Sequence, residues 1–457
     1  MTEQKPVENK MGTMPVNKLL ITMSLPMMVA MLVQAMYNVV DSVFVAQIDA
    51  ESLGLAAVSM AFPVQSLMIA FATGTGVGVN ALLSRRLGEK KLKEASLTAK
   101  NGIFVILITY IVFALFGIFG SRLFFSLQTT DTRVIEMGVQ YLSVCCIFSF
   151  GLFLEIILER LLQSTGKTIY TMFTQGAGAI INIIFDPLLI FGIGPFPKMG
   201  VQGAAVATVA GQIVAAALAF LFNHWKNHEI NISMRKFRPH GRTIRQIYSV
   251  GIPSIIMQSI VSIMTFGMNK ILMIFPTQGT VAVSVFGVYF KLQSFIFMPV
   301  FGLNNGMVPI IAYNYGAKNK QRITQTIKLS IIIAVGFMVV GLLIFQLLPD
   351  QLLLLFNASK DMLEIGGYAL RIISLSFIFA GFSTIIISVF QALGNGVYSL
   401  VISAARQLVI ILPVAYLLAV TAGLHSVWFA FPIAELCCVI LCFIMLRHIY
   451  NQKIKQL

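Results

Sequence analysis

Acidic and amide side chains occur inside long apolar stretches of this 457-residue sequence, where they are able to bind a proton or a small cation. Asp186 stands in NIIFDPLLIFG (182–192), and Asn182 lies four residues earlier, one turn away on the same helical face. At the centre of a membrane helix an aspartate costs roughly 2.5–3.5 kcal/mol, so such a residue usually marks a function. Asp186 is therefore the first candidate for chemistry in this chain.

Further polar residues stand at helical spacing in other apolar stretches. Gln34, Asn38 and Asp41 follow one another at i, i+4 and i+7, which places them in one stripe along a helix. Ionisable groups rarely face lipid, so we expect these stripes to face the interior of a helix bundle. The remaining candidates are Thr208, a hydroxyl in a helix of small residues, and Glu155 and Glu159, two carboxylates one turn apart.

Asp41 and Asp186 have no lysine or arginine within the apolar segments of the same half of the chain to neutralise them. Two carboxylates close together in a medium of low dielectric cannot both ionise at low cost. Such a pair takes up H⁺, or binds Na⁺ through carboxylate, amide and hydroxyl oxygens.

A simpler interpretation stays open for several of these residues. Asn182, Thr208, Gln34 and Asn38 could serve only to lock helices together through buried hydrogen bonds. Glu155 could lie at the edge of the lipid or of a cavity, and Glu159 could pair with the adjacent Arg160.

Composition shows which elements must position these side chains. Hydrophobic residues make up 58% and charged residues 11% of the chain, whereas a soluble domain carries about 25% charged residues. Apolar runs such as 103–119 approach the roughly 20 residues needed to cross a bilayer. We therefore predict an all-α polytopic membrane protein with about twelve spans: 18–45, 53–83, 96–120, 135–163, 168–194, 201–224, 244–275, 280–312, 324–348, 363–393, 397–423 and 425–448.

The distribution of lysine and arginine predicts the orientation. Most of the 32 basic residues fall in the segments on the same side as the N-terminus, and the opposite side has only Arg122, Arg133, Lys198 and Lys360. The positive-inside rule then places both termini in the cytoplasm and explains the net charge of +15 without a nucleic-acid partner. The polar N-terminal segment predicts no removable signal peptide, and the five cysteines, all in apolar runs, predict no disulfide or metal site.

The two halves of the chain resemble each other. FPVQSLMIAFATGTGVG (62–78) aligns with FKLQSFIFMPVFGLNNG about 228 residues later, and SLPMMV (24–29) aligns with GIPSII (251–256). We therefore expect two parallel six-helix repeats around a central cleft, as in secondary transporters. No nucleotide-binding loop GxxxxGK[ST] occurs, so energy should come from an ion gradient. The predicted parts are a cytoplasmic tail (1–17), an N-lobe (18–224), a cytoplasmic linker (225–243), a C-lobe (244–448) and a second tail (449–457).

The duplication makes the acidic centre asymmetric. Asp41 aligns with Asn269, and Asp186 aligns near Leu412 or Pro413, so the C-terminal half has neutral groups at both positions. Its own charged residues within apolar segments include Arg406 and Glu435, which are candidates for an ion pair.

Several motifs together resemble the multidrug and toxic compound extrusion (MATE) family, over essentially the whole chain. They are SLPMM…YNVVDSVFVA, GTGVGVNALLSRRLGEKK, NIIFDPLLIFG, GVQGAAVAT and VPIIAYNYGAKN, and LERLLQSTG is similar to the bacterial MepA-like branch. The resemblance implies two six-helix lobes and antiport of organic cations against H⁺ or Na⁺. It also implies a site for H⁺ or Na⁺ at Asp41, Asn182, Asp186 and Thr208, with Glu159 as a further coupling carboxylate. Some members carry acidic residues in the seventh and tenth spans, but the segments PSIIMQSIVSIMTFGMNKIL and LRIISLSFIFAGFSTIIISVFQALG have none here, so no C-lobe Na⁺ site is expected.

The predicted function is export of amphipathic, mostly cationic drugs by a monomer in the bacterial cytoplasmic membrane, with no cofactor besides the coupling ion. Pro26 is the candidate hinge, and the candidate substrate contacts are Gln34, Tyr37, Asn38, Asn269 and Tyr289. One alternative is a flippase or exporter of a lipid-linked or other polar metabolite; another is a carrier of the major-facilitator type. A membrane-embedded enzyme is disfavoured because all five histidines lie outside membrane depth.

Overall fold

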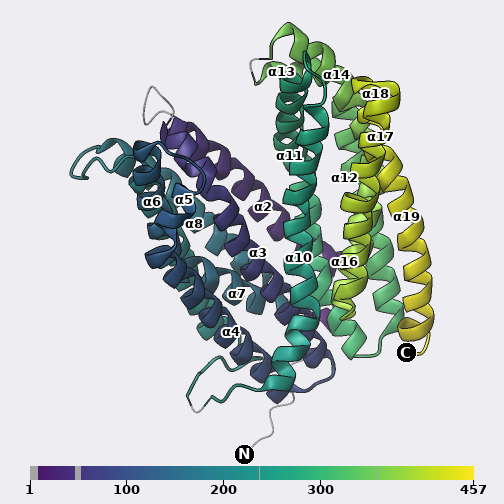
Figure 1. Cartoon of the computed structure of the whole chain (residues 1–457). Coiled ribbons are helices and arrows are strands. Elements are labelled where there is room, and N and C mark those ends of the chain that lie inside the picture. Colours follow the sequence, from purple (N-terminus) through teal and green to yellow (C-terminus); the bar gives the residue numbers. More distant parts are fainter. Residues whose placement is uncertain (1–8, 47–52, 236, 357) are drawn as a thin grey trace, which may run out of the picture. The chain divides into compact units, whose positions relative to one another are not determined.

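The computed structural model describes residues 9–46, 53–235, 237–356 and 358–457, and the secondary structure of these residues is entirely helical (Figure 1). This confirms the predicted all-α class. The N-terminal half contains α1 (Lys10–Thr13), α2 (Val16–Ala46), α3 (Leu53–Gly88), α4 (Leu92–Phe119), α5 (Ser121–Ser126), α6 (Thr132–Ile147), α7 (Phe150–Ser164), α8 (Thr168–Phe191) and α9 (Val201–Lys226). The C-terminal half contains α10 (Gly241–Leu272), α11 (Gly279–Gly316), α12 (Lys320–Leu347), α13 (Pro349–Leu354), α14 (Lys360–Ser374), α15 (Phe377–Ala392), α16 (Gly396–Ala404), η1 (Ala405–Ile411), α17 (Leu412–Ala422), α18 (Leu424–Val427), α19 (Ala430–Ile449) and η2 (Tyr450–Ile454).

Ten helices within the described ranges are long and apolar enough to cross a membrane, and two bent pairs bring the number to twelve if each pair is one span. The bends are 41° between α6 and α7 and 49° between α14 and α15. At the first break the Ser149 hydroxyl donates to the Cys146 carbonyl at 2.7 Å, and at the second the Ser376 hydroxyl donates to the Ile373 carbonyl at 2.6 Å. Such local bonds compete with the helical ladder. The two breaks fall at equivalent positions of the halves, which supports the duplication.

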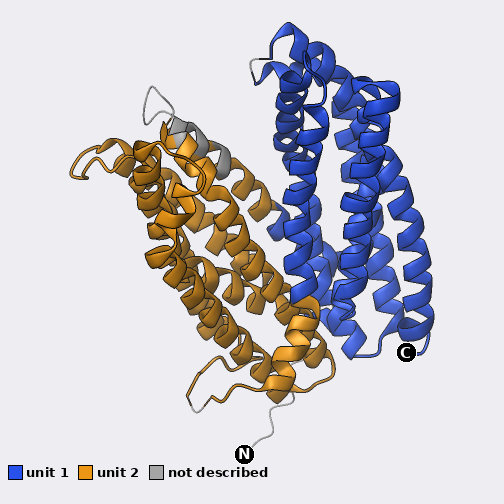
Figure 2. Ribbon diagram, in the orientation of Figure 1, with its two compact units in different colours: residues 1–28, 252–457 blue, residues 29–251 orange. Residues whose placement is uncertain are grey.

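The chain forms two compact units, and one of them combines two separate segments of the chain (Figure 2). One unit contains the residues up to Met28 together with Ile252–Leu457, and the other contains Val29–Gly251. The predicted lobes, 18–224 and 244–448, differ from these units because α2 and α10 each change unit part-way along. The change in α2 comes just after Pro26, and the change in α10 comes just before Pro253.

Glycines explain how each unit accommodates the start of a helix from the other half of the chain. A methyl group on Gly78 of α3 would lie 3.0 Å from the carbonyl carbon of Ile247 in α10, and closer still to its oxygen. In the other unit, a methyl group on Gly306 of α11 would lie 2.7 Å from the Cα of Ser24 in α2. Both glycines therefore let two helix backbones approach closely, as small residues do in membrane proteins.

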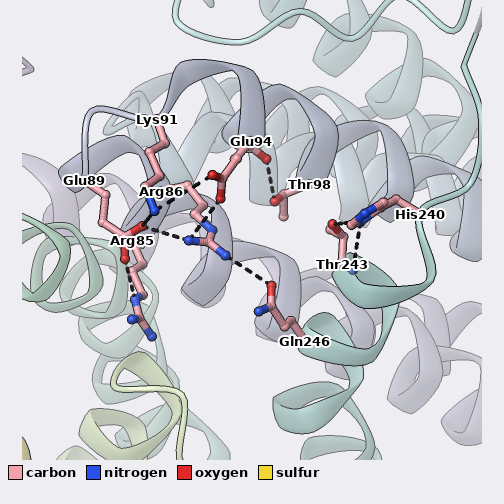
Figure 3. Close-up of polar contacts among 9 residues, drawn as sticks. All are labelled: Arg85, Arg86, Glu89, Lys91, Glu94, Thr98, His240, Thr243 and Gln246. Atoms are coloured by element: carbon pink, nitrogen blue, oxygen red, sulfur yellow. Dashed lines mark hydrogen bonds and ion pairs between the residues drawn. The ribbon is translucent and has the colours of Figure 1, made fainter.

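An arginine holds the beginning of each of these helices. Arg86, at the end of α3, donates from Nη2 to Oε1 of Gln246 in the first turns of α10 at 3.3 Å (Figure 3). In the other unit, Nη2 of Arg322 donates to the carbonyls of Met11 at 2.9 Å and Met14 at 2.7 Å, just before α2 begins. In each unit, hydrogen bonds from an arginine thus hold the start of a helix that continues into the other unit.

Arg86 also belongs to an ion cluster at the turn between α3 and α4 (Figure 3). Glu89 accepts hydrogen bonds from Arg85 Nε at 2.9 Å and Arg86 Nη1 at 2.8 Å, and Lys91 Nζ lies 3.2 Å away. Partial burial favours the neutral form of Glu89, but the bonds from Arg86, Arg85 and Lys91 outweigh it. They hold the pKa of this carboxyl below its ordinary value of 4.5.

The substitution Gly78→Ala tests the close approach of α3 and α10. The added methyl group must push the two helices apart, so we expect a loss of about 1–3 kcal/mol in unfolding free energy, measured by thermal unfolding in detergent. The matched control is Gly176→Ala in α8, where no heavy atom would lie within 4 Å of the new group. Equal stability of the two variants would contradict the packing.

The substitution Glu89→Gln tests the ion cluster. Because the folded state lowers the pKa of Glu89, its stabilising contribution should be complete well above pH 4.5 and should disappear as pH falls through the folded-state pKa. We expect the variant to be less stable by about 1 kcal/mol at neutral pH and equal to the wild type in acid. Glu136→Gln, which removes a carboxylate at an exposed position in the same unit, is the control. A difference that persists in acid would show that the effect is not electrostatic.

Candidate functional site

The centre of the candidate site lies on α8, in the unit formed by Val29–Gly251. Asn182 and Asp186 are one turn apart and are buried, with 3% and 0% of their surface exposed. Helix α9 packs tightly on this face because Gly178 and Gly211 bring the two backbones together; a methyl group on Gly178 would lie 3.1 Å from the carbonyl oxygen of Gly211. This close packing places Thr208 of α9 beside Asn182.

Asn182 connects Thr208 to Asp186. One orientation of the Asn182 amide gives both its oxygen and its nitrogen a partner. In this orientation Oδ1 accepts from the Thr208 hydroxyl at 3.2 Å, and Nδ2 donates to Oδ2 of Asp186 at 3.3 Å. Oδ1 of Asp186 is buried and has no partner among the described residues. Pro187 follows directly and lacks an N–H, so the carbonyl of Ile183 is without its usual helical donor.

Asp41 of α2 completes the group. Its carboxyl lies within hydrogen-bonding reach of Asp186, and its Oδ1 is likewise buried with no partner in the described part of the chain. Two ionised carboxylates only accept hydrogen bonds, so their contact requires a shared proton or a cation between them. The donor set of two carboxylates and a hydroxyl suits H⁺ or a hard cation such as Na⁺. The structure therefore brings together all four residues that the resemblance implied.

Two tyrosines border this group. Tyr37 hydrogen-bonds to Gln34 and lies near the carboxyls of Asp41, Asp186 and Glu155. The Glu155 carboxyl thus faces the same interior as the aspartates. Asn38, the remaining candidate on this helix, has a side chain outside the described residues.

Sequence reasoning did not identify the second tyrosine, Tyr141 of α6. Its hydroxyl accepts from Gln65 Nε2 at 3.0 Å, the same amide lies 3.6 Å from Cys145 Sγ, and Tyr141 is a neighbour of Asp41. The sequence indicates this neighbourhood only through Gln65, which places an amide side chain inside an apolar span.

Glu159 occupies a separate cluster. It is 3% exposed, and its two oxygens accept from the Thr174 hydroxyl at 2.6 Å and from Gln175 Nε2 at 2.7 Å. Thr174 lies about 18 Å from Asp186 along α8, at 1.5 Å per residue. Of the five predicted coupling residues, four therefore form one group, and Glu159 contacts α8 more than three helical turns away from Asp186.

The other predicted substrate residues belong to the unit that contains Ile252–Leu457. Asn269 is half-buried in α10, and Tyr289 of α11 is 3% exposed. The ring of Tyr289 lies 6.2 Å from Phe286, 5.6 Å from Phe290 and 5.9 Å from Phe431, measured between centroids. Tyr289 is thus part of an aromatic cluster within that unit.

Comparison with known proteins gives consistent matches over nearly the whole chain. The profile of the MatE family matches residues 26–188 and again residues 253–417, so each half carries one copy. The multidrug export protein MepA of Staphylococcus aureus (strain MSSA476) is 28% identical over 429 residues, which cover 93% of this chain and 92% of that protein. A protein named FAD transporter from Shewanella oneidensis is 28% identical over 442 residues, 95% of each chain.

A solved structure gives the same result for the fold. It is described as the outward-facing conformation of a multidrug resistance MATE family transporter of the MOP superfamily. The TM-score is 0.92 at 25% identity, with 99% of this chain and 100% of that chain covered. The fold and the family predicted from the sequence motifs are confirmed.

The hydroxyl of Thr208 provides a test of the site's geometry. Thr208→Val keeps the shape of the side chain but removes the donor to Asn182, so we expect a loss of about 1 kcal/mol in unfolding free energy. Thr208→Ser retains the hydroxyl and should be close to the wild type. If the valine and serine variants unfold at the same temperature, the Asn182–Thr208 bond does not form.

Proposed function

Because the chain belongs to the MatE family of secondary transporters, we propose that it is a cation-coupled antiporter that exports amphipathic, mostly cationic drugs in exchange for H⁺ or Na⁺. It is a multi-pass membrane transporter and not an enzyme. In this proposal it lies in the cytoplasmic membrane of a bacterium as a monomer with both termini in the cytoplasm, as the positive-inside rule predicts.

The observation that carries the proposal is the contact between Asp41 and Asp186. One oxygen of each is buried without a partner in the described structure, and the Asn182 amide links Asp186 to the Thr208 hydroxyl. With a proton or Na⁺ bound, the negative charge of the group falls and its burial becomes tolerable. When the cation leaves, the carboxylates require water, which favours another arrangement of the helices around them.

Helix α2 is suited to transmit this change. It carries Asp41 in one unit, and Pro26 lies immediately before the point where the helix enters that unit. Proline removes a backbone hydrogen bond and permits bending there. Pro26 is therefore the proposed hinge, and Gln34 and Tyr37, between the hinge and the aspartate, are the proposed contacts for drug in this helix.

The available energy is sufficient. Each proton moving down one pH unit supplies about 1.4 kcal/mol, and each charge crossing 100 mV supplies about 2.3 kcal/mol. Exchange of one or two cations thus sustains a drug gradient of about tenfold or more. Drug and coupling ion must then lower each other's affinity by the same factor, because coupling between binding sites is reciprocal.

Glu159 has a secondary place in the proposal. Both of its oxygens already accept hydrogen bonds, which is the arrangement that an ionised carboxylate needs. The aspartate pair, with an unpartnered oxygen on each residue, is better suited to exchange a cation. Replacement of Glu159 by glutamine should therefore impair coupling less than replacement of either aspartate.

Export of a polar metabolite is a second candidate function. It is supported by the similarity, over 95% of each chain, to the protein named FAD transporter. A transport assay with anionic as well as cationic substrates separates the two candidates.

The variants Asp41→Asn and Asp186→Asn test the proposed coupling. In proteoliposomes with an imposed pH or Na⁺ gradient, each should abolish gradient-driven efflux of a fluorescent cation such as ethidium. Asn269→Ala, at the position equivalent to Asp41 in the other half, should have a milder effect. Ethidium binding to the purified wild type should release H⁺ or Na⁺, and binding to Asp186→Asn should release neither. Normal pumping by both aspartate variants would place the coupling site elsewhere.

A further inference from the structure

We propose that the unit containing Ile252–Leu457 has a second binding site, which takes the carboxylate or phosphate group of an organic anion. Arg406 is its anchor, and Glu435 is the internal counter-ion that the ligand displaces. The proposal rests on the transport function, because a ligand must reach membrane depth, but it does not depend on the aspartate pair.

The two side chains form the ion pair that the sequence suggested. Nη1 of Arg406 donates to Oε1 of Glu435 at 3.0 Å, and 18% and 10% of the two side chains are exposed. Arg406 lies about 15 Å along the helical span Gly396–Ala422, near its middle, and Glu435 lies at similar depth in Leu424–Ile454. Ionisable residues at such depth are costly and are usually retained for a function.

The pair is incompletely satisfied. A guanidinium carries five N–H donors. Among the described residues, the Arg406 side chain donates one hydrogen bond, to Oε1 of Glu435. Oε2 of Glu435 is buried and has no partner in the described ranges, and the same holds for Oε1 of the adjacent Gln407, which is 5% exposed. We would expect an arginine–carboxylate pair with a purely structural role to be bidentate, with two parallel N–H···O hydrogen bonds. The unused donors of Arg406 are those that a second anionic group needs.

The exposed part of Arg406 indicates where such a ligand could enter. A guanidinium at membrane depth does not face lipid; it faces the bundle interior or a water-filled space. Tyr289, whose ring packs on Phe431, lies near both charges. Its hydroxyl is a neutral donor suited to the same anion.

The backbone at Arg406 departs from α-helical geometry. Residues Ala405–Ile411 form a π-helix between α16 and α17, and Pro413 follows it. π-helical turns are rare and occur frequently at functional sites. Because this turn contains Arg406, a change of its backbone would move the guanidinium relative to Glu435 on α19.

The duplication adds an independent argument. The aspartate group depends on the fifth and sixth spans of the N-terminal half, α8 and α9. The Arg406–Glu435 pair is built from the fifth and sixth spans of the C-terminal half. The same two helices therefore position a site for a cation in one half and a cationic side chain in the other.

Equilibrium binding of two fluorescent anions to the purified protein in nanodiscs tests the proposal. The probes are fluorescein, which has a carboxylate, and 4-methylumbelliferyl phosphate; preference for one identifies the group that the site takes. Glu435→Gln removes the competing carboxylate and should tighten anion binding by about tenfold or more. Arg406→Gln should weaken it by at least about tenfold.

The double variant Arg406→Gln/Glu435→Gln removes both charges, so it avoids a buried unpaired charge, and it should fold but bind neither anion. Arg371→Gln, an exposed arginine of the same unit, is the control and should bind as the wild type does. Unchanged anion binding in the double variant, or no gain in Glu435→Gln, would overturn the proposal. Ethidium binding with ion release, measured in the same samples, reports on the aspartate pair; its absence would contradict the proposed function alone.

Discussion

The hydrocarbon interior of a membrane offers no hydrogen-bond partner, so every polar group at that depth must find one within the protein. Most do so locally: hydroxyls in the spans return to carbonyls one turn earlier, as Thr109 does to Val105. Among the described residues, the buried polar atoms left without a partner include one carboxylate oxygen each of Asp41, Asp186 and Glu435, which are the ionisable ones. Because such groups are costly, they indicate where the molecule binds something.

Close helix packing is what makes these exceptions possible. Glycines let α8 and α9 approach until the amide of Asn182 bridges Thr208 and Asp186, and larger residues at Gly178 or Gly211 would separate them. In the C-terminal half the fifth and sixth spans approach again, but they carry Arg406 and Glu435. Duplication has thus preserved a scaffold that positions an acidic group in one half and an ion pair in the other.

The spans could be predicted from apolar length and the duplication from internal similarity, whereas the grouping of Asp41, Asn182, Asp186 and Thr208 came from the resemblance to the family. The bends at Ser149 and Ser376 could not, since each depends on a side chain competing with the helix that contains it. The distance of Glu159 from Asp186 depends on the register between α7 and α8. That register is set by packing and not by the spacing of the residues along the chain.

The exchange of helix segments between the two units has a consequence for biogenesis. The segment that ends at Met28 packs against Gly302 and Gly306, which are translated roughly 280 residues later. At a synthesis rate of about 5–20 residues per second, this segment waits roughly 15 to 55 seconds before its partner exists. During that time the apolar first helix needs lipid or the insertion machinery as a temporary neighbour. The packing of this segment is therefore timed by the emergence of α11 and not by completion of the first half of the chain.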